Sequence, residues 1–151
     1  MFYGMDSRIV WKYWTSEILY IENMEIKKIK SNLQMDEFYF SECSIEHSKK
    51  VKNGDYNADL QREIKKTSEH KYEVILTLTV NKEDLNLKVV ANAKFSYEDE
   101  DEDNERERKV IEMNTVAIMF PFIRSQVTLL TSQPGMVPMV LPPINTAKLV
   151  S

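Results

Sequence analysis

The chain has 151 residues, and its hydrophobic content of 42% is enough for one domain with a modest core. Its formal net charge of -4 argues against a protein that binds the phosphate backbone of nucleic acids. The single cysteine, Cys43, excludes an internal disulfide and is typical of a protein that works in the reducing cytoplasm.

The first 23 residues combine large apolar side chains with charges that interrupt every apolar run, so we expect no secretory signal. The charges are Asp6, Arg8, Lys12 and Glu17, and the large apolar residues are Trp11, Tyr13, Trp14, Leu19, Tyr20 and Ile21. Two interpretations stay open: an extra helix or strand that covers an edge, or a translated leader of little structure before a start at Met24. We expect an N-terminal extension over residues 1–23 and the main domain over residues 24–151.

From residue 34 the hydrophobic pattern alternates with period two, which predicts β-strands. The first run covers residues 34–51, where Phe38 and Phe40 alternate with smaller or more polar side chains. An Asn-Gly pair at residues 53 and 54 follows, and this pair is the strongest short signal for a hairpin turn. A second run over residues 56–66 is polar enough to be an edge strand.

Two further runs, residues 72–80 and 85–97, alternate without a break and are separated by a turn over residues 81–84. The side chains expected to point into the core are Val74, Leu76, Leu78 and Val80 in one run, and Leu85, Leu87, Val89, Ala91, Ala93, Phe95 and Tyr97 in the other. The sequence therefore predicts four antiparallel strands whose sheet has one apolar and one polar face.

Six consecutive acidic residues, Glu98 to Asp103, come after the last strand, and Asn-Glu-Arg-Glu-Arg-Lys follows them. Blocks of like charge repel one another and stay solvated. We interpret the segment as a solvated crossover loop from the sheet to a helix, in preference to a metal or partner site.

The stretch from Asn114 to Ala147 contains a single charged residue, Arg124. Its longest apolar run, residues 116–123, has eight residues and includes a proline, whereas a helix needs about 20 apolar residues to span a membrane. The stretch does not predict a membrane span, so its lack of charge needs another physical reason.

A helix in this stretch has an apolar side and a side of small hydroxyl residues. The apolar side comprises Met119, Phe120, Phe122, Ile123, Val127, Leu129 and Leu130, of which Ile123, Val127 and Leu130 are expected in the core. The other side comprises Arg124, Ser125, Thr128, Thr131 and Ser132. Because a solvent-facing helix surface usually carries Lys and Glu, we expect another subunit to cover the hydroxyl side, with Arg124, Ser125, Thr128 and Ser132 at that interface.

Pro134 and Gly135 should end the helix, because proline cannot donate to the helical ladder and glycine accepts a positive φ. The apolar segment that follows is broken by Pro138, Pro142 and Pro143, which excludes a helix or a central strand. We predict an extended proline-rich arm that offers apolar side chains, among which methionine is flexible enough to suit varied partners.

The sequence contains no recognisable motif for a catalytic site. His47 and His70 have no motif spacing to Cys43, and the three glycines form no phosphate-binding loop. A lone cysteine on a strand is more often a small buried hydrophobe than a nucleophile. We expect no catalytic site, no metal site and no cofactor, since no group passes the test for an activated nucleophile.

The C-terminal residues carry a resemblance to a known family. The motifs are Phe120-Pro121-Phe122 opening a helix with Arg124 one turn on, then Pro134-Gly135, Pro138 and Leu141-Pro142-Pro143-Ile144-Asn145. They resemble the C-terminal half of the SecB export chaperones, most closely the SecB-like proteins found outside the proteobacteria. The similarity covers roughly residues 34–150, and the sheet part agrees in pattern alone.

This resemblance implies an α+β fold: a four-stranded antiparallel sheet with Greek-key-like connections, an acidic crossover loop, a long helix and a proline-rich C-terminal arm. It also implies a cytoplasmic, ATP-independent holdase for protein export and translocation, built as a homotetramer from a dimer of dimers. Its partners are unfolded polypeptides or preproteins, held in apolar grooves. The client-binding candidates are Phe38, Phe40, Val116, Met119, Phe120, Phe122, Met136, Val137, Met139, Val140 and Leu141.

The sequence departs from the best-known members at two places. Glu37 matches one acid of their contact surface for the motor SecA, but Ser41 replaces another, so Glu37 is the one candidate SecA contact. We also expect no zinc-binding tail, since the chain ends at Ser151 without a Cys/His cluster. Two alternatives therefore stay open: a chaperone dedicated to one client, such as an antitoxin, and an oligomeric adaptor that is no chaperone.

Overall fold

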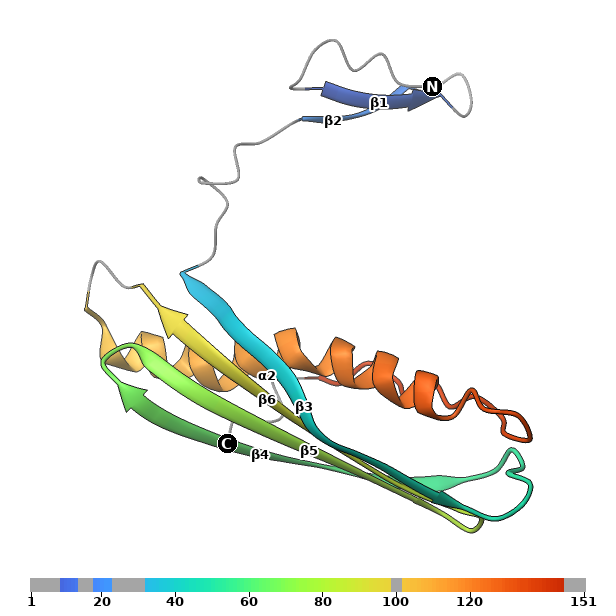
Figure 1. The fold of residues 1–151 in the computed structure, drawn as a ribbon. Helices are drawn as coiled ribbons and strands as arrows, with labels where there is room; N and C mark the ends of the chain where they lie inside the picture. Colours follow the sequence, from blue (N-terminus) through green and yellow to red (C-terminus); the bar gives the residue numbers. More distant parts are fainter. Residues whose placement is uncertain (1–8, 14–17, 23–31, 99–101, 146–151) are drawn as a thin grey trace. The chain divides into compact units, whose positions relative to one another are not determined.

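The computed structural model describes residues 9–13, 18–22, 32–98 and 102–145, and its chain divides into two compact units, Met1–Ser31 and Asn32–Ser151. In the first unit, β1 (Ile9–Tyr13) and β2 (Ile18–Glu22) form an antiparallel pair (Figure 1). These two strands lie within the predicted extension, while its other residues lie outside the described ones. The boundary after residue 23 and the edge-covering role both stay predictions.

The second unit contains the predicted four-stranded antiparallel sheet. Its strands are β3 (Leu33–His47), β4 (Tyr56–Ser68), β5 (Lys71–Lys82) and β6 (Leu85–Tyr97), in the spatial order β3-β6-β5-β4. Three consecutive strands joined by hairpins, with the remaining strand beside the last of them, make a Greek key. The predicted fold class is confirmed.

The predicted hairpin at the Asn-Gly pair of residues 53 and 54 is wrong, because β3 and β4 lie at opposite edges of the sheet. The chain instead makes its hairpins between β4 and β5 and between β5 and β6. The alternating apolar residues of β6 need neighbours on both sides, and β3 supplies the second one. The prediction that the second run is an edge strand is correct, since β4 pairs with β5 alone among the described strands.

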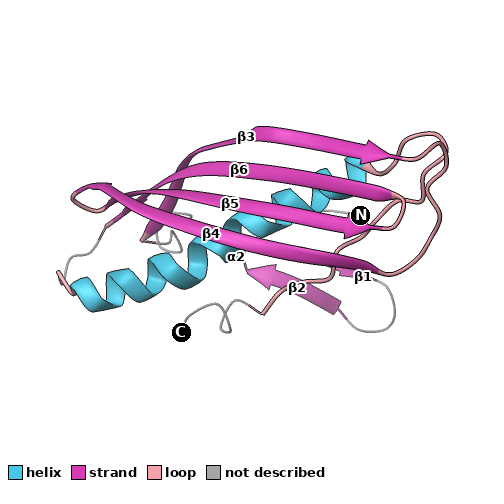
Figure 2. Ribbon diagram, turned by 90° about the horizontal axis from the view of Figure 1, so that it is seen from below, coloured by secondary structure: helices cyan, strands magenta, loops and turns pink. Residues whose placement is uncertain are grey.

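One face of the sheet forms the core. Every inward-facing residue predicted for β5 and β6 is buried, with an exposed fraction of 3% or less. The reason is the period of the pleat: residues two apart point to the same face. The helix α2 (Asn104–Leu130) lies across this face, as Figure 2 shows. Among the helix residues predicted for the core, Ile123 and Val127 are buried and Leu130 is partly buried.

The helix begins much earlier than the sequence motif suggests. Asp103 caps it by accepting a hydrogen bond from the backbone N–H of Arg106, and Glu105 and Glu107 in the first turn suit the positive end of the helix dipole. The residues after Asp103 are therefore helical and do not belong to the crossover. Pro121 does not open the helix but lies inside it, at a cost of about 3 kcal/mol that the burial of neighbouring Phe120 and Ile123 offsets.

A histidine on the β4–β5 turn anchors the first turns of α2. His70, at a φ of 59°, places its Nδ1 atom 2.5 Å from the carboxylate of Glu107, which is 2% exposed. This hydrogen bond raises the pKa of His70, and the nearby carboxylate of Glu69 adds to the effect, whereas burial and Lys66 oppose it. Burial raises the pKa of Tyr72, beside Glu107, to about 12, so its hydroxyl stays neutral.

We therefore expect the domain to lose stability as the pH rises through the pKa of His70. The stabilisation is complete below the ordinary histidine pKa of 6.5 and disappears above the raised pKa of the folded state, because only the protonated ring pairs ionically with Glu107. Melting temperature measured against pH should show this step, and His70→Gln should remove it. The exposed His47→Gln serves as control, and a step that persists in His70→Gln would contradict the assignment.

Candidate functional site

The proline-rich segment after the helix, residues 134–145, is an irregular extended arm, as predicted. Gly135 has a φ of +83°, which only glycine adopts without strain, and turns the chain back toward α2. The carbonyl of Gly135 accepts a hydrogen bond of 2.9 Å from the backbone N–H of Val51 in the loop between β3 and β4. The start of the arm is thereby tied to the end of the sheet.

Side chains of α2 hold the arm in place where it has no strand partner. Met139 accepts a bond from the Thr128 hydroxyl at its carbonyl and donates its N–H to the Thr131 hydroxyl, both at 2.8 Å. Arg124 donates its Nε–H to the carbonyl of Leu141 at 2.9 Å. Because backbone groups need hydrogen-bond partners, these side chains determine the course of the arm.

The hydroxyl side of the helix is consequently shared between the arm and solvent. Arg124, Thr128 and Thr131 contact the arm of the same chain, whereas Ser125 and Ser132 are exposed. The expectation from sequence was that another subunit covers this side. The arm of the same chain contacts Arg124 and Thr128. The interface role of Arg124, Ser125, Thr128 and Ser132 stays a prediction.

The arm presents apolar side chains on its outer side. Val137 is 43% exposed and Val140 is 69% exposed, while Met136 and Met139 are partly buried. Partly buried and exposed side chains alternate here because the two hydrogen bonds at Met139 turn that residue toward the helix. Its neighbour Val140 consequently points away from the helix. Four of the eleven client-binding candidates thus lie at or near the surface of the arm.

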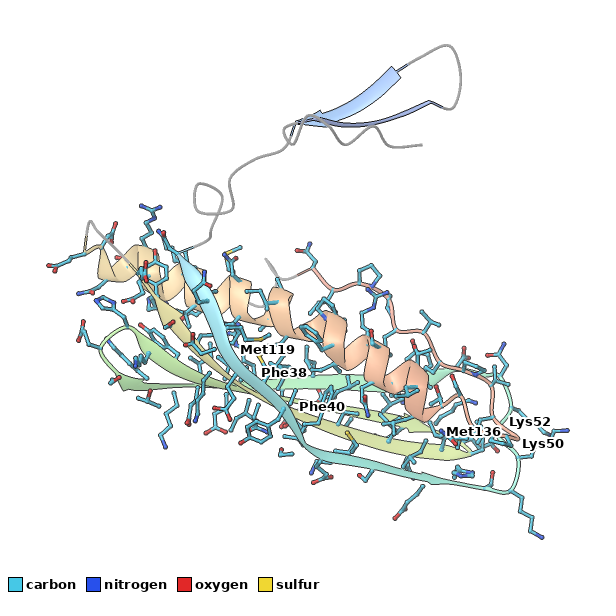
Figure 3. The ribbon with its side chains drawn as sticks, turned by 45° about the horizontal axis from the view of Figure 1, so that its top comes forward. Phe38, Phe40, Lys50, Lys52, Met119 and Met136 are labelled. Carbon is cyan, nitrogen blue, oxygen red and sulfur yellow. The ribbon has the colours of Figure 1, made fainter. Side chains whose placement is uncertain are left out.

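Three phenylalanines form a second apolar surface, between β3 and α2. The ring of Phe38 lies 4.9 Å from that of Phe122 and 5.2 Å from that of Phe40, the latter in an edge-to-face arrangement. Phe122 is 47% exposed, and the two strand residues are partly buried. We call these three residues the Phe patch; Figure 3 labels its two strand members. Cys43 on the same strand is exposed, so its expected burial is wrong, because β3 lies at the edge of the sheet.

The remaining client-binding candidates belong to the core. Val116, Met119, Phe120 and Leu141 are each 5% exposed or less, so their client-binding role stays a prediction. The three helix residues pack in the core cluster, and Leu141 accepts the hydrogen bond from Arg124. Apolar character alone did not distinguish them from the exposed members.

A hollow of about 170 Å³ lies between edge strand β4 and the end of the arm. It is lined by Tyr56, Ala58, Leu60, Leu78, Phe120, Leu141, Pro142 and Ile144, almost all of them apolar. The hollow was not expected from the sequence, since no local pattern shows that β4 and the arm meet. The alternation of Ala58 and Leu60 was the one available signal.

The candidate SecA contact, Glu37, lies on the outer face of the sheet and is paired. Its carboxylate is 2.9 Å from Nζ of Lys94, and this hydrogen bond raises the pKa of the lysine. Ser41 accepts a bond of 2.6 Å from the side-chain amide of Asn92. The neighbouring acid Glu42 lies 3.7 Å from Lys88, so both Glu37 and Glu42 have a lysine partner.

No cluster of three His, Cys, Asp or Glu side chains that could hold a metal occurs within the described ranges. No helix among those residues is long and apolar enough to cross a bilayer.

A protein-family model described as preprotein translocase subunit SecB matches residues 26–151. The chain belongs to the SecB family. Its fold is similar to that of a SecB-like chaperone from Mycobacterium tuberculosis, solved in complex with a ChAD peptide from the HigA1 antitoxin. That alignment has a TM-score of 0.61 and 16% identity, and it covers 76% of this chain and 91% of the other.

A curated archaeal protein is similar to this SecB-family chain over a short stretch. This uncharacterized protein of Methanocaldococcus jannaschii is 40% identical over 40 residues, which is 26% of this chain and 26% of that protein. Because the match spans about a quarter of the relative, it carries no statement on what the whole SecB-family chain binds.

Proposed function

We propose that this SecB-family protein is an ATP-independent chaperone that holds non-native polypeptides on an apolar surface. The observation that carries the proposal is where its exposed large apolar side chains lie. Of the five such residues in the described part of the chain, Phe122, Leu129, Val137 and Val140 belong to α2 or the arm. A protein that kept its apolar residues only for its own core would not gather them on one pair of elements.

The Phe patch and the outer side of the arm suit extended, unfolded segments. Burying one large apolar side chain contributes roughly 1.5–3 kcal/mol, so a few contacts of this kind can retain a segment without sequence selectivity. A folded client offers few apolar side chains at its surface and gains little by comparison. Nucleotide is not needed for binding that rests on apolar contact alone.

A homotetramer, built as a dimer of dimers, is the assembly we propose. An exposed and uncharged stripe runs along α2 through Phe122, Ser125 and Leu129, which fall on one face at the spacing of a helix, and the exposed Ser132 follows just after the helix end. Small hydroxyl side chains next to apolar ones allow close approach of a second helix. The interface role predicted for Ser125 and Ser132 gains support from this stripe.

The clients we propose are preproteins in the cytoplasm before export, in line with the family's description as a translocase subunit. A dedicated client is the second candidate, since the similar chaperone of M. tuberculosis was solved with an antitoxin peptide. Engagement of SecA through Glu37 stays a prediction, and its ion pair with Lys94 would have to open for that contact.

Aggregation of an unrelated, chemically unfolded enzyme, followed by light scattering without nucleotide, tests the proposal. We expect the wild type to delay aggregation. The double variant Val137→Asp, Val140→Asp should require about a hundredfold more protein for the same delay, because each of the two lost apolar contacts removes roughly 1.5 kcal/mol of client binding. Its melting temperature should change little, since both side chains are exposed.

A charge-matched control places two aspartates on the exposed outer face of β4, as Asn57→Asp and Gln61→Asp. This variant should delay aggregation as well as the wild type does. Failure of the wild type to delay aggregation of any unfolded enzyme would overturn the chaperone proposal and favour an oligomeric adaptor.

A further inference from the structure

The loop between β3 and β4, residues 48–55, brings lysines to the start of the arm. Val51 is buried and bonded to Gly135, so its neighbours Lys50 and Lys52 lie at the surface on either side of it. Figure 3 shows both lysines beside Met136 at one end of the sheet. Asp84 fixes the loop by accepting the backbone N–H of Lys52 at 2.8 Å and, through its carbonyl, that of Ser48 at 3.1 Å.

A hollow of about 160 Å³ lies where this loop meets the arm. Its lining consists of Lys52, Asn53, Gly54, Tyr56, Lys82, Val137, Pro138, Met139 and Val140. One wall is thus apolar and contributed by the arm, and the other carries two lysines and no acid. The side chain of Lys82 is only 7% exposed, and its Nζ lies 3.2 Å from Asp84.

Acidic groups nearby do not face this hollow. Asp84 is occupied by Lys82 and by the backbone of Lys52, whereas Asp55 and Glu83 line a separate hollow with Asn57 and Asn81. The side chains of Lys49, Lys50 and Lys52 are exposed, and none forms an ion pair within the part of the chain that the structure describes. The lining of the hollow itself is therefore basic, while the acids Asp55 and Glu83 belong to the adjoining hollow, which shares Tyr56 and Lys82 with it.

The arm also leaves backbone groups available next to the hollow. The N–H and C=O groups of Val137 and Val140 have no hydrogen-bond partner among residues 32–98 and 102–145, while those of Met139 are bonded to the helix. An extended peptide can pair with such groups and place alternate side chains toward the arm. This backbone pairing favours a polypeptide over a lipid as the occupant.

We propose that the arm and the basic loop bind an extended polypeptide segment in which apolar side chains are flanked by carboxylates. The inference rests on the proposed chaperone function and names the class of segment that this surface selects. Val137 and Val140 contact the apolar side chains, and Lys50 and Lys52 attract the flanking acids. Charges farther off than about 10 Å are screened in physiological salt, so a bound segment responds mainly to the charges that line the hollow and its rim.

Two synthetic peptides with the same apolar residues, one flanked by glutamates and one by lysines, test the selection against the full-length protein. Fluorescence anisotropy should show the acidic peptide binding about tenfold more tightly, because several exposed charge pairs each contribute a modest attraction. The difference should vanish toward about 1 M salt, where the screening length falls to about 3 Å.

Lys52→Glu should lower the affinity for the acidic peptide about fivefold, by turning attraction into repulsion. The control is Lys109→Glu, which makes the same change of net charge at an exposed position of α2 away from the arm. Both variants should keep the melting temperature of the wild type, since each lysine side chain is exposed and unpaired in the described structure.

The outcomes separate this inference from the function it rests on. Equal affinity of the wild type for the two peptides, or a preference that Lys52→Glu leaves undiminished, overturns the inference, while delayed aggregation would leave the chaperone proposal standing. Displacement of the acidic peptide by vesicles that contain an anionic phospholipid, dependent on Lys52, would show a membrane surface instead and also overturn it. If no peptide binds and no aggregation is delayed, both proposals fail.

Discussion

Met119→Ala should lower the free energy of unfolding by about 2–5 kcal/mol, the range for truncating a buried methionine or leucine. The side chain is 0% exposed and belongs to the core cluster between α2 and the sheet. The loss has two parts: the transfer free energy of the removed atoms, and the cavity that the rigid sheet cannot close. Equilibrium unfolding in urea would measure it.

The matched comparison is Val140→Ala, at an exposed position on the arm. This change should stay within about 0.5 kcal/mol in stability, as most surface substitutions do, and should affect client binding instead. The two variants thereby distinguish a core residue from a client contact, although the sequence alone places both among the client-binding candidates. A Met119→Ala protein that unfolds like the wild type but binds clients poorly would show that Met119 reaches the surface.

Ser125→Glu should dissociate the proposed tetramer. An unpaired carboxylate in a buried interface costs about 3–5 kcal/mol, which raises a dissociation constant roughly a hundredfold or more. Ser125 suits this test better than Thr128, because Thr128 holds the arm through Met139 and its replacement would release the arm as well. Sedimentation velocity at micromolar concentration would report the change in mass.

Gln61→Glu, on the exposed outer face of β4, adds the same charge and should leave the assembly intact. A wild type that sediments as a monomer would remove the proposed interface altogether. A Ser125→Glu protein that remains tetrameric would place the subunit contact elsewhere than on the stripe of α2. In either case the fold of the single chain would be unaffected, because Ser125 makes no contribution to the core.

Client binding and assembly use neighbouring parts of α2 in this proposal. Phe122 touches Phe38 across the edge of the sheet, while Ser125 and Leu129 continue the same face of the helix toward its end. Phe122 belongs to both the Phe patch and the stripe, so the Phe patch lies at the edge of the proposed subunit contact, and a client held there could extend across two copies of the chain. Clients that span subunits gain affinity from several weak contacts at once.

Much of the fold is encoded locally. The inward-facing residues of β5 and β6 followed from alternation, because a strand repeats every two residues and one face of the sheet must be buried. The extended arm followed from its prolines, which exclude a regular ladder. The motif around Pro121 and the residues from Leu141 to Asn145 also identified the family correctly.

Strand order could not be read in the same way. The Asn-Gly pair after β3 is a strong local turn signal, yet β3 pairs with β6, a strand distant in sequence. Which distant strands pair depends on how their apolar faces pack together into one core. A turn signal at a few neighbouring residues contains no information on this packing. The start of α2 could not be predicted either. Its capping residue, Asp103, is the last of a run of acids, and such a run is typical of a solvated loop.

The division of apolar residues between core and surface was decided by tertiary structure alone. Met119 and Phe122 are both large, apolar and on one helix, but only Phe122 lies beyond the edge of the sheet where a partner can reach it. Likewise Leu141 is buried and Val140 exposed because Arg124, Thr128 and Thr131 orient the arm through its backbone. Periodicity determines which residues share a face, whereas the packing of distant elements determines whether that face is covered.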